Sequence, residues 1–548
     1  MILKKYSTKT LLIFLVLSLG FGSWAFTKSE YFRQLERSQK LFHWVNRELM
    51  SKYVDDIDIE AYTKKSIQNM LSELDPYTVF LEAEERDGLD MLTNGKYGGV
   101  GIQIGRRDKH LTVIAPMNNS PAQRAGIISG DHIIAIDQTS TKDIGLDEAA
   151  KLIRGEKGTT VVLTIERFGE HEPIEFSLKR DDIKVENVAY VGLIDDQVGY
   201  LRLTRFSKNA VSEMRQALKK LQNQNVNSIV LDLRDNPGGL LQSAIGVLDL
   251  FIEKGDVLLT TKGKGRETNR SYKSDHDPVI DQDIKIAVLI NHGSASASEI
   301  VAGAIQDLDR GVILGSRSFG KGLVQSVYNF DKKRSLKITT AKYYIPSGRL
   351  IQKPNYNNND IIAWTAEEDS IFSTVGGRAV KGGGGIFPDV EVTYDKPSTL
   401  VGECWRKGLF FSFVQKHRDR FMTQEDIILD DQIIADFEEF ISDQDLELPI
   451  SGESQLDVAY EKLMAIDSTD TTMIEAFNSI NAFINKQEAA LFQQEIDQIK
   501  LRLKMEYANL FSGTAGRIEI SLIDDPVVNK AIEVLENTNM YQEIFVAN

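Results

Sequence analysis

The sequence is poor in cysteine, and this scarcity excludes several kinds of chemistry. Its 548 residues include one cysteine, Cys404, so no disulfide can form within the chain. Paired cysteines and an H-E-x-x-H segment are both absent, so the usual ligand sets of a zinc site are missing. No histidine lies near Cys404 in the sequence, and we interpret it as a structural thiol. We therefore expect neither a metal nor another cofactor.

Basic residues are outnumbered as well. The chain has 64 Lys and Arg against 80 Asp and Glu, which gives a formal net charge of −16. No long cluster of Lys or Arg interrupts this acidic balance, so nucleic acid is not an expected partner. Hydrophobic residues make up 42% of the chain, which is ordinary for a globular protein. The length allows several domains of roughly 100–200 residues each.

The N-terminus carries an uncharged, mainly apolar run from Thr10 to Thr27, preceded by Lys4 and Lys5. A basic flank followed by such a run is typical of a signal peptide, although the run nearly reaches the about 20 residues that span a bilayer. We therefore interpret residues 1–27 as a signal peptide or membrane anchor, with the lysines on the cytoplasmic side. The protein is expected to be exported and periplasmic or cell-envelope, with anchoring to the inner membrane by residues 10–27 as one alternative.

A glycine-rich segment marks the next folded region. It reads Tyr97-Gly98-Gly99-Val100-Gly101-Ile102. Glycines let a backbone turn several N–H groups toward one anion, and the strand that follows offers an edge for an added peptide strand. A glycine cluster alone would also fit a plain turn. However, Gly130-Asp131-His132-Ile133-Ile134 follows in the order that is usual for a PDZ domain, so we predict a PDZ domain whose glycine-rich segment binds the substrate tail.

A serine-rich turn lies between an apolar strand-like run, 286–290, and an apolar helical run, 300–305. The turn reads Ser294-Ala295-Ser296-Ala297-Ser298-Glu299. A hydroxyl at a strand-to-helix turn stands clear of the sheet, near the positive end of the helix dipole, which suits a nucleophile. Serine is also a common N-cap, and the residues alone do not decide which serine would react.

A lysine between glycines follows in the segment Phe319-Gly320-Lys321-Gly322. The glycines allow close approach of another backbone, and apolar neighbours would desolvate the lysine. Desolvation disfavours the ammonium form and lowers the pKa of a lysine, as a general base requires. An arbitrary lysine is usually a solvated surface charge. Together with the serine turn, however, this segment predicts a Ser-Lys dyad for acyl transfer.

These segments resemble the C-terminal processing peptidases, also called tail-specific proteases, a family of Ser-Lys serine peptidases with a PDZ domain. The resemblance extends to D-L-R-D-N-P-G-G at 232–239 and covers most of the chain. It implies that Ser296 is the nucleophile, that Lys321 is the general base, and that Gln325 supports the lysine. Gln325 lies four residues after Lys321, so on an extended segment both would point to the same face.

The oxyanion of an acyl-transfer reaction needs fixed donors. The Ala297 N–H, next to the predicted nucleophile, is one candidate. The other is a glycine of the Gly238-Gly239 pair, because a missing side chain lets the backbone approach the substrate. We prefer Gly238, although the pair would also fit a tight turn.

The predicted fold class is α/β multidomain. The resemblance implies a crotonase-like α/β protease core with a PDZ domain, which is β-rich with helices, between N-terminal helices and a C-terminal helical domain. The predicted regions are the signal peptide or anchor at 1–27, a helical region at 28–90, the PDZ domain at 91–180, the Ser-Lys peptidase core at 181–400, and a C-terminal helical domain at 401–548.

The function that these predictions imply is a serine endopeptidase. It would recognise the C-terminal tails of exported proteins through its PDZ domain and cleave them through an acyl-enzyme. Further expected partners are a second copy of the chain or an adaptor protein, and the membrane through the N-terminal segment. Two alternatives stay open: a non-catalytic PDZ scaffold of the cell envelope, and a triad hydrolase that uses one of seven histidines, of which His292 lies nearest to Ser296 in the sequence.

Overall fold

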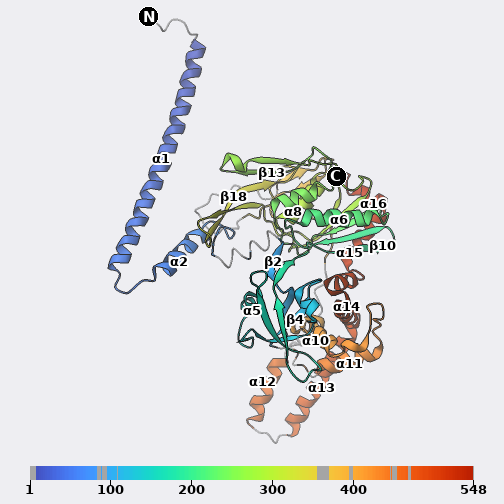
Figure 1. The fold of residues 1–548 in the computed structure, drawn as a ribbon. Helices are drawn as coiled ribbons and strands as arrows, with labels where there is room; N and C mark the ends of the chain where they lie inside the picture. Colours follow the sequence, from blue (N-terminus) through green and yellow to red (C-terminus); the bar gives the residue numbers. More distant parts are fainter. Residues whose placement is uncertain are drawn as a thin grey trace. The chain divides into compact units, whose positions relative to one another are not determined.

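The computed structural model describes residues 8–82, 88, 95–107, 109–354, 370–393, 399–442, 444, 446, 453–466 and 471–546 (Figure 1). These residues form two units. One is built mainly from the chain up to Phe80 and the other from the residues after it.

The N-terminal unit is helical, as predicted. It consists of α1 (Thr8–Lys52) and α2 (Ile59–Ser72). Asp58 caps α2 by accepting a hydrogen bond from the Ala61 N–H at 3.0 Å. Among the described residues, no helix combines the length and the apolar character that crossing a membrane requires.

The first part of the larger unit is a small β-rich domain. Its main sheet has the order β3-β4-β5-β7-β8, and β6 pairs with β5. Strand β7 alternates buried and less buried residues, as expected for a strand with one face on a core. The elements are β2 (Lys96–Gly99), β3 (Ile102–Arg107), β4 (His110–Pro116), α4 (Pro121–Ala125), β5 (His132–Ile136), β6 (Thr139–Ser140), α5 (Leu146–Ile153), β7 (Thr160–Glu166), β8 (Ile174–Lys179) and β9 (Asp181–Lys184).

A six-stranded sheet forms the centre of the larger unit. Its order is β10-β11-β12-β15-β16-β21, in which β10 pairs antiparallel with β11 and the other pairs are parallel. Strand β12 is buried at every position, which is typical of a parallel strand covered on both faces. The strands are β10 (Val188–Asp195), β11 (Val198–Leu203), β12 (Ser228–Asp232), β15 (Lys285–Ile290), β16 (Val312–Gly315) and β21 (Val390–Glu391).

Helices cover both faces of this sheet. Leu231 and Val288 pack on one side with helices α6 (Ala210–Gln222), α7 (Leu241–Leu248) and α8 (Ala297–Asp307). The intervening residues Val230 and Leu289 pack instead with the C-terminal helices, mainly α15 (Pro526–Glu536) and α16 (Thr538–Glu543). Neighbouring residues of a strand point to opposite faces, so the two helix sets form layers on opposite sides of the sheet.

A second sheet contacts α7 and α8 through β13. In it, β18 pairs antiparallel with both β13 and β17. Its strands are β1 (Val79–Leu81), β13 (Val257–Gly263), β14 (Arg270–Lys273), β17 (Leu323–Asn329) and β18 (Ser335–Tyr344). Strands β19 (Ile371–Ser373) and β20 (Ala379–Lys381) form a separate antiparallel hairpin. Two short 3-10 helices lie at Arg266–Thr268 and Arg418–Arg420.

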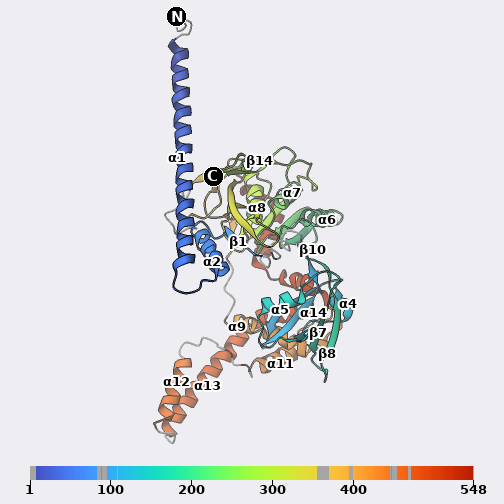
Figure 2. The same ribbon diagram turned by 60° about the vertical axis from the view of Figure 1, so that its left-hand side comes forward.

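The C-terminal helices pack in two places. Helices α9 to α11 and the first part of α14 share one apolar cluster, in which Cys404 is fully buried. Ile518, near the end of α14, and Leu522, which follows the helix, pack on the central sheet. Helices α12 and α13 form a hairpin (Figure 2), with the Tyr460 and Phe477 rings 4.8 Å apart. The helices are α9 (Thr399–Lys407), α10 (Leu409–Lys416), α11 (Asp431–Ser442), α12 (Glu453–Met464), α13 (Thr471–Gln494) and α14 (Ile496–Ser521).

Candidate active site

Three loops meet at the carboxyl edge of the central sheet. Residues 233–240 follow β12, the serine turn follows β15, and the Lys321 segment follows β16. Strands β12, β15 and β16 are parallel neighbours, so their carboxyl ends lie at the same edge. In open α/β sheets this edge is where ligands bind. The fold therefore gathers the predicted nucleophile, base and oxyanion segments.

The structure separates the three serines of the turn. The Ser294 hydroxyl is buried and donates to the Leu233 carbonyl at 2.8 Å. The Ser298 hydroxyl is also buried and donates to the Asn236 carbonyl at 2.8 Å. Ser296 is partly exposed and precedes α8 with φ 55° and ψ −109°. A positive φ in a residue other than glycine is strained, and such strain concentrates at active sites. These features support Ser296 as the reactive serine.

The buried carboxylate of Glu299 joins the serine turn to the lysine segment. Its Oε2 accepts hydrogen bonds from the Ser296 N–H and the Lys321 N–H, both at 2.8 Å. Its Oε1 accepts from the Gly320 N–H and the Ser318 hydroxyl, both at 2.6 Å. Burial raises the pKa of Glu299 to about 7, although these hydrogen bonds act in the opposite direction. One side chain thus fixes the backbones of both predicted catalytic residues.

The second sheet provides a further connection between these residues. The Tyr343 hydroxyl, from β18, lies 3.2 Å from the Ser296 carbonyl oxygen and within hydrogen-bond distance of the Lys321 carbonyl oxygen. Sequence reasoning missed both Glu299 and Tyr343. The Ser-x-x-Glu spacing of a capping box could have identified Glu299, whereas no sequence pattern marks Tyr343.

The glycines beside Lys321 allow the close approach that the sequence predicts. A Cβ built on Gly320 would lie 2.9 Å from the Gly384 carbonyl carbon, and one on Gly322 would lie 2.7 Å from the Gln352 nitrogen. Gln325 lies in β17 and donates to the Thr339 hydroxyl at 3.3 Å. The β17–β18 register shifts between Val324 and Gln325, and the extra residue at the shift, Thr340, lies in β18. The supporting role of Gln325 stays a prediction.

The two predicted oxyanion donors lie side by side. A Cβ built on Gly238 would be 2.9 Å from the Ala297 nitrogen and 3.0 Å from the Ser296 Cβ, so this position has no space for a side chain. Gly238 also has a φ of 97°, which glycine adopts readily. Its N–H donates to Asn236 Oδ1 at 2.9 Å. Use of the Gly238 N–H on a substrate oxyanion therefore requires that hydrogen bond to be shared or exchanged.

A groove of about 340 Å³ lies in the β-rich domain between β3 and α5. Four of the predicted tail-binding residues line it: Tyr97, Val100, Gly101 and Ile102. The other two, Gly98 and Gly99, lie in β2 and pair with Asp182 and Asp181 of β9.

One basic side chain also lines this groove. The guanidinium of Arg154 lies 5.4 Å from the centre of the Tyr97 ring. This groove, lined by apolar side chains together with Gln103, Asp147 and Arg154, can accommodate a peptide end that carries a carboxylate.

Cys404 lies apart from this site, in the apolar cluster of the C-terminal helices. Burial raises the pKa of the Cys404 thiol to about 12, which leaves it protonated. Within the described ranges, no three His, Cys, Asp or Glu side chains are grouped as metal ligands.

Comparison with known proteins identifies the family. Residues 197–361 match the model of peptidase family S41, residues 89–166 match the PDZ domain, and residues 401–535 match the "probable PDZ-protease, C-terminal helical domain". The carboxy-terminal-processing protease of Bartonella bacilliformis is 40% identical over 326 residues, which are 59% of this chain and 73% of that protein. The carboxyl-terminal-processing protease of Synechocystis is 37% identical over 348 residues, 62% and 79% of the two chains.

The solved structure of a photosystem II D1 C-terminal processing protease also matches, with 29% sequence identity and a TM-score of 0.36. The match covers 64% of this chain and 86% of that protein. The sequence matches carry the assignment. The chain belongs to the C-terminal processing proteases of peptidase family S41, which are serine proteases. The predicted family, the fold class and the presence of a PDZ domain are therefore confirmed, and peptides are the substrate class.

Proposed function

We propose that this protease cleaves exported proteins through a Ser-Lys dyad and an acyl-enzyme. The observation that carries the proposal is the shared anchoring of Ser296 and Lys321 by Glu299, with both backbone N–H groups 2.8 Å from the same oxygen. This shared anchor fixes the backbones of the two residues relative to each other. Positioning of this kind lowers the entropic cost of bringing a base to its nucleophile.

The reaction begins with Lys321 in its neutral form. Lys321 takes the proton of the Ser296 hydroxyl as the oxygen attacks the carbonyl carbon of the substrate. The Ala297 N–H and a glycine of the Gly238-Gly239 pair stabilise the resulting oxyanion. The C–N bond then breaks, the leaving amine receives the proton from Lys321, and water hydrolyses the ester on Ser296.

The PDZ groove holds the C-terminal tail of the substrate while another part of the substrate enters the active site at Ser296. Tyr97, Val100, Gly101 and Ile102 form the groove wall, and Arg154 supplies a positive charge for the terminal carboxylate. We further propose export, with residues 1–27 as the signal or anchor. Pairing with a second copy or an adaptor stays a prediction.

Cleavage of an unstructured test protein with an apolar C-terminal tail tests the dyad. The full chain would be compared with Ser296→Ala and Lys321→Ala, and circular dichroism would confirm that each variant folds. We expect activity in the wild type and none in either variant. Normal cleavage by folded Lys321→Ala would refute the dyad and make a histidine-dependent enzyme the better interpretation. A folded, inert wild type that also fails to react with a serine-directed phosphonate would favour the non-catalytic scaffold.

A further inference from the structure

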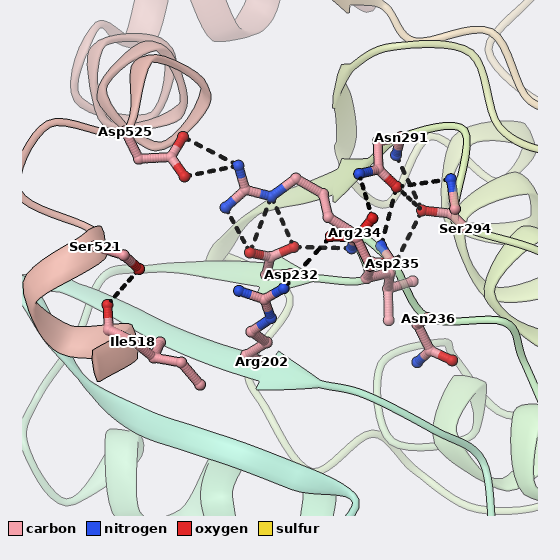
Figure 3. A network of polar contacts seen from close by, with 12 residues as sticks. Arg202, Asp232, Arg234, Asp235, Asn236, Asn291, Ser294, Ile518, Ser521 and Asp525 are labelled. Carbon is pink, nitrogen blue, oxygen red and sulfur yellow. Dashed lines mark hydrogen bonds and ion pairs between the residues drawn. The ribbon is translucent and has the colours of Figure 1, made fainter. Parts of the chain in front are cut away.

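A buried arginine connects the loop that follows β12, residues 233–240, to Asp525 before helix α15 (Figure 3). Arg234 is 5% exposed and lies between two carboxylates. Its Nε lies 3.0 Å from both oxygens of Asp232, and its Nη2 lies 2.6 Å from Asp232 Oδ2. Its Nη1 donates to both oxygens of Asp525, at 3.0 and 2.7 Å. Residues 234 and 525 are 291 positions apart in the sequence.

The first carboxylate belongs to the sheet itself. Asp232 ends β12, is fully buried, and also accepts a hydrogen bond from the Tyr200 hydroxyl at 2.6 Å. Burial alone would raise the pKa of Asp232, but the charge and hydrogen bonds of Arg234 outweigh it and keep that pKa below its ordinary value. Asp232 and Arg234 therefore form an ion pair within one strand end.

The second carboxylate comes from the N-cap of α15. Asp525 Oδ1 accepts the N–H groups of Val527 at 3.0 Å and Val528 at 3.2 Å, in addition to binding Arg234. At the other end of α15, the Leu535 carbonyl accepts a hydrogen bond from Lys285, the first residue of β15, at 2.6 Å. Helix α15 thus runs antiparallel to the parallel strands, with its N-terminus at the same sheet edge as the active site.

From Arg234, a short path leads to the nucleophile. Asp235, the next residue, has φ 58°, a strained value for a residue other than glycine. The Asn236 carbonyl then accepts the Ala295 N–H at 3.0 Å and the Ser298 hydroxyl at 2.8 Å, which fixes both sides of Ser296. Gly238 follows, so close to the serine turn that an added Cβ would lie 3.0 Å from the Ser296 Cβ. A shift at Arg234 would therefore move the supports of the serine and of the oxyanion donors.

We propose that Asp525 is a positioning residue: through Arg234 it couples helix α15 to the loop 234–239 and so holds the oxyanion site and Ser296 in their working geometry. Helix α15 would then support the geometry of the active site in addition to packing on the central sheet. The inference rests on the proposed function for its kinetic consequence, whereas the coupling itself can be measured without activity.

A pair of substitutions in the full chain separates the charge of Asp525 from its capping role. Asp525→Asn keeps a preferred N-cap and loses the charge, whereas Asp525→Glu keeps the charge and is the poorer cap. Asn537→Ala is the matched control, because Asn537 caps α16 by accepting the Met540 N–H at 3.1 Å. Asp525→Ser, another good cap without charge, replaces the asparagine variant if the latter does not fold.

The first readout is kinetic. We expect Asp525→Asn to lower kcat at least about tenfold with KM within about twofold, because misplacement by about 1 Å costs up to about a hundredfold in rate. Asp525→Glu should retain more of kcat than Asp525→Asn, and Asn537→Ala should match the wild type. Retention of kcat within about twofold in folded Asp525→Asn, or greater loss in Asp525→Glu, would overturn the inference, because capping alone would then explain the residue.

The second readout is hydrogen exchange of peptides that cover 233–240 and 293–300. We expect faster exchange of both in Asp525→Asn than in the wild type and in Asn537→Ala. Unchanged exchange in Asp525→Asn would overturn the inference even if the wild type had no protease activity. The two proposals can fail separately. If the wild type is active, Ser296→Ala is inactive and Asp525→Asn is fully active, the coupling is refuted and the proposed function stands.

Discussion

Replacing Glu299 by glutamine should remove a pH dependence of stability while the chain still folds. Burial raises the pKa of Glu299 from 4.5 to about 7. At about 1.4 kcal/mol for each pKa unit, ionising this group in the folded protein costs about 3 kcal/mol. The folded state binds the proton more tightly than the unfolded state. The stability that the protonated Glu299 contributes is therefore complete at pH values below its pKa in the unfolded chain. This contribution is lost as the pH rises through the folded-state pKa of about 7.

Glutamine has no charge to desolvate, so this loss of stability disappears. Its amide nitrogen would face either the Ser296 and Lys321 N–H groups or the Gly320 N–H and the Ser318 hydroxyl, which now donate to the two carboxylate oxygens. Donors left without an acceptor cost about 1–3 kcal/mol each at every pH. We therefore expect Glu299→Gln to be clearly less stable than the wild type at pH 5 and closer to it at pH 8.

Urea unfolding of the full chain at pH 5 and pH 8, followed by far-UV circular dichroism, measures this difference. Glu391→Gln is the matched control, because Glu391 is exposed in β21. Its pH dependence should equal that of the wild type. If Glu299→Gln lost as much stability between pH 5 and pH 8 as the wild type, the buried charge would not be the cause.

Three further substitutions or probes test other parts of the structure. Gly238→Ala should lower kcat about a hundredfold or more, because its Cβ would lie 2.7 Å from the Ala295 oxygen beside the oxyanion donors; wild-type kinetics would contradict the placement of this loop. Ala150→Trp should fill the PDZ groove and weaken binding of a C-terminal peptide, measured by fluorescence anisotropy, while cleavage of a short peptide ester persists; unchanged binding would show that tails bind elsewhere. Cys404 should react with a thiol reagent only after unfolding, because it is fully buried and its pKa is about 12; fast labelling of the native protein would refute that burial.

The sequence singled out the segments that the structure brings together better than the residues that support these segments. Ser296, Lys321 and Gly238 stand in short motifs of unusual composition, and the structure brings these motifs to one sheet edge. Helix α15 begins after Asp525 as its N-cap, with Pro526 in the first turn. The packing of that helix could not be predicted, because an apolar helical face does not reveal which sheet it will cover. The pairing of Gln325 with Thr339 could not be predicted either, because it depends on an extra residue in β18, and no composition rule foretells such a bulge.

The supporting residues follow from the strain of the site. Ser296, Asp235 and Gly238 all have positive φ, and for the two residues other than glycine each such conformation costs about 1–3 kcal/mol unless the surroundings enforce it. The surroundings here are buried polar groups: Glu299 accepts the Ser296 N–H, and the Asn236 carbonyl accepts the Ala295 N–H and the Ser298 hydroxyl.

A buried polar group must itself be hydrogen-bonded, so each of these anchoring groups also bonds to a partner in another segment. Asn236 donates to the Leu203 carbonyl at 2.7 Å. Glu299 reaches the lysine segment, and Arg234 reaches Asp525 near the end of the chain. The strained backbone around Ser296 therefore accounts for the way that segments far apart in the sequence converge on this edge of the sheet.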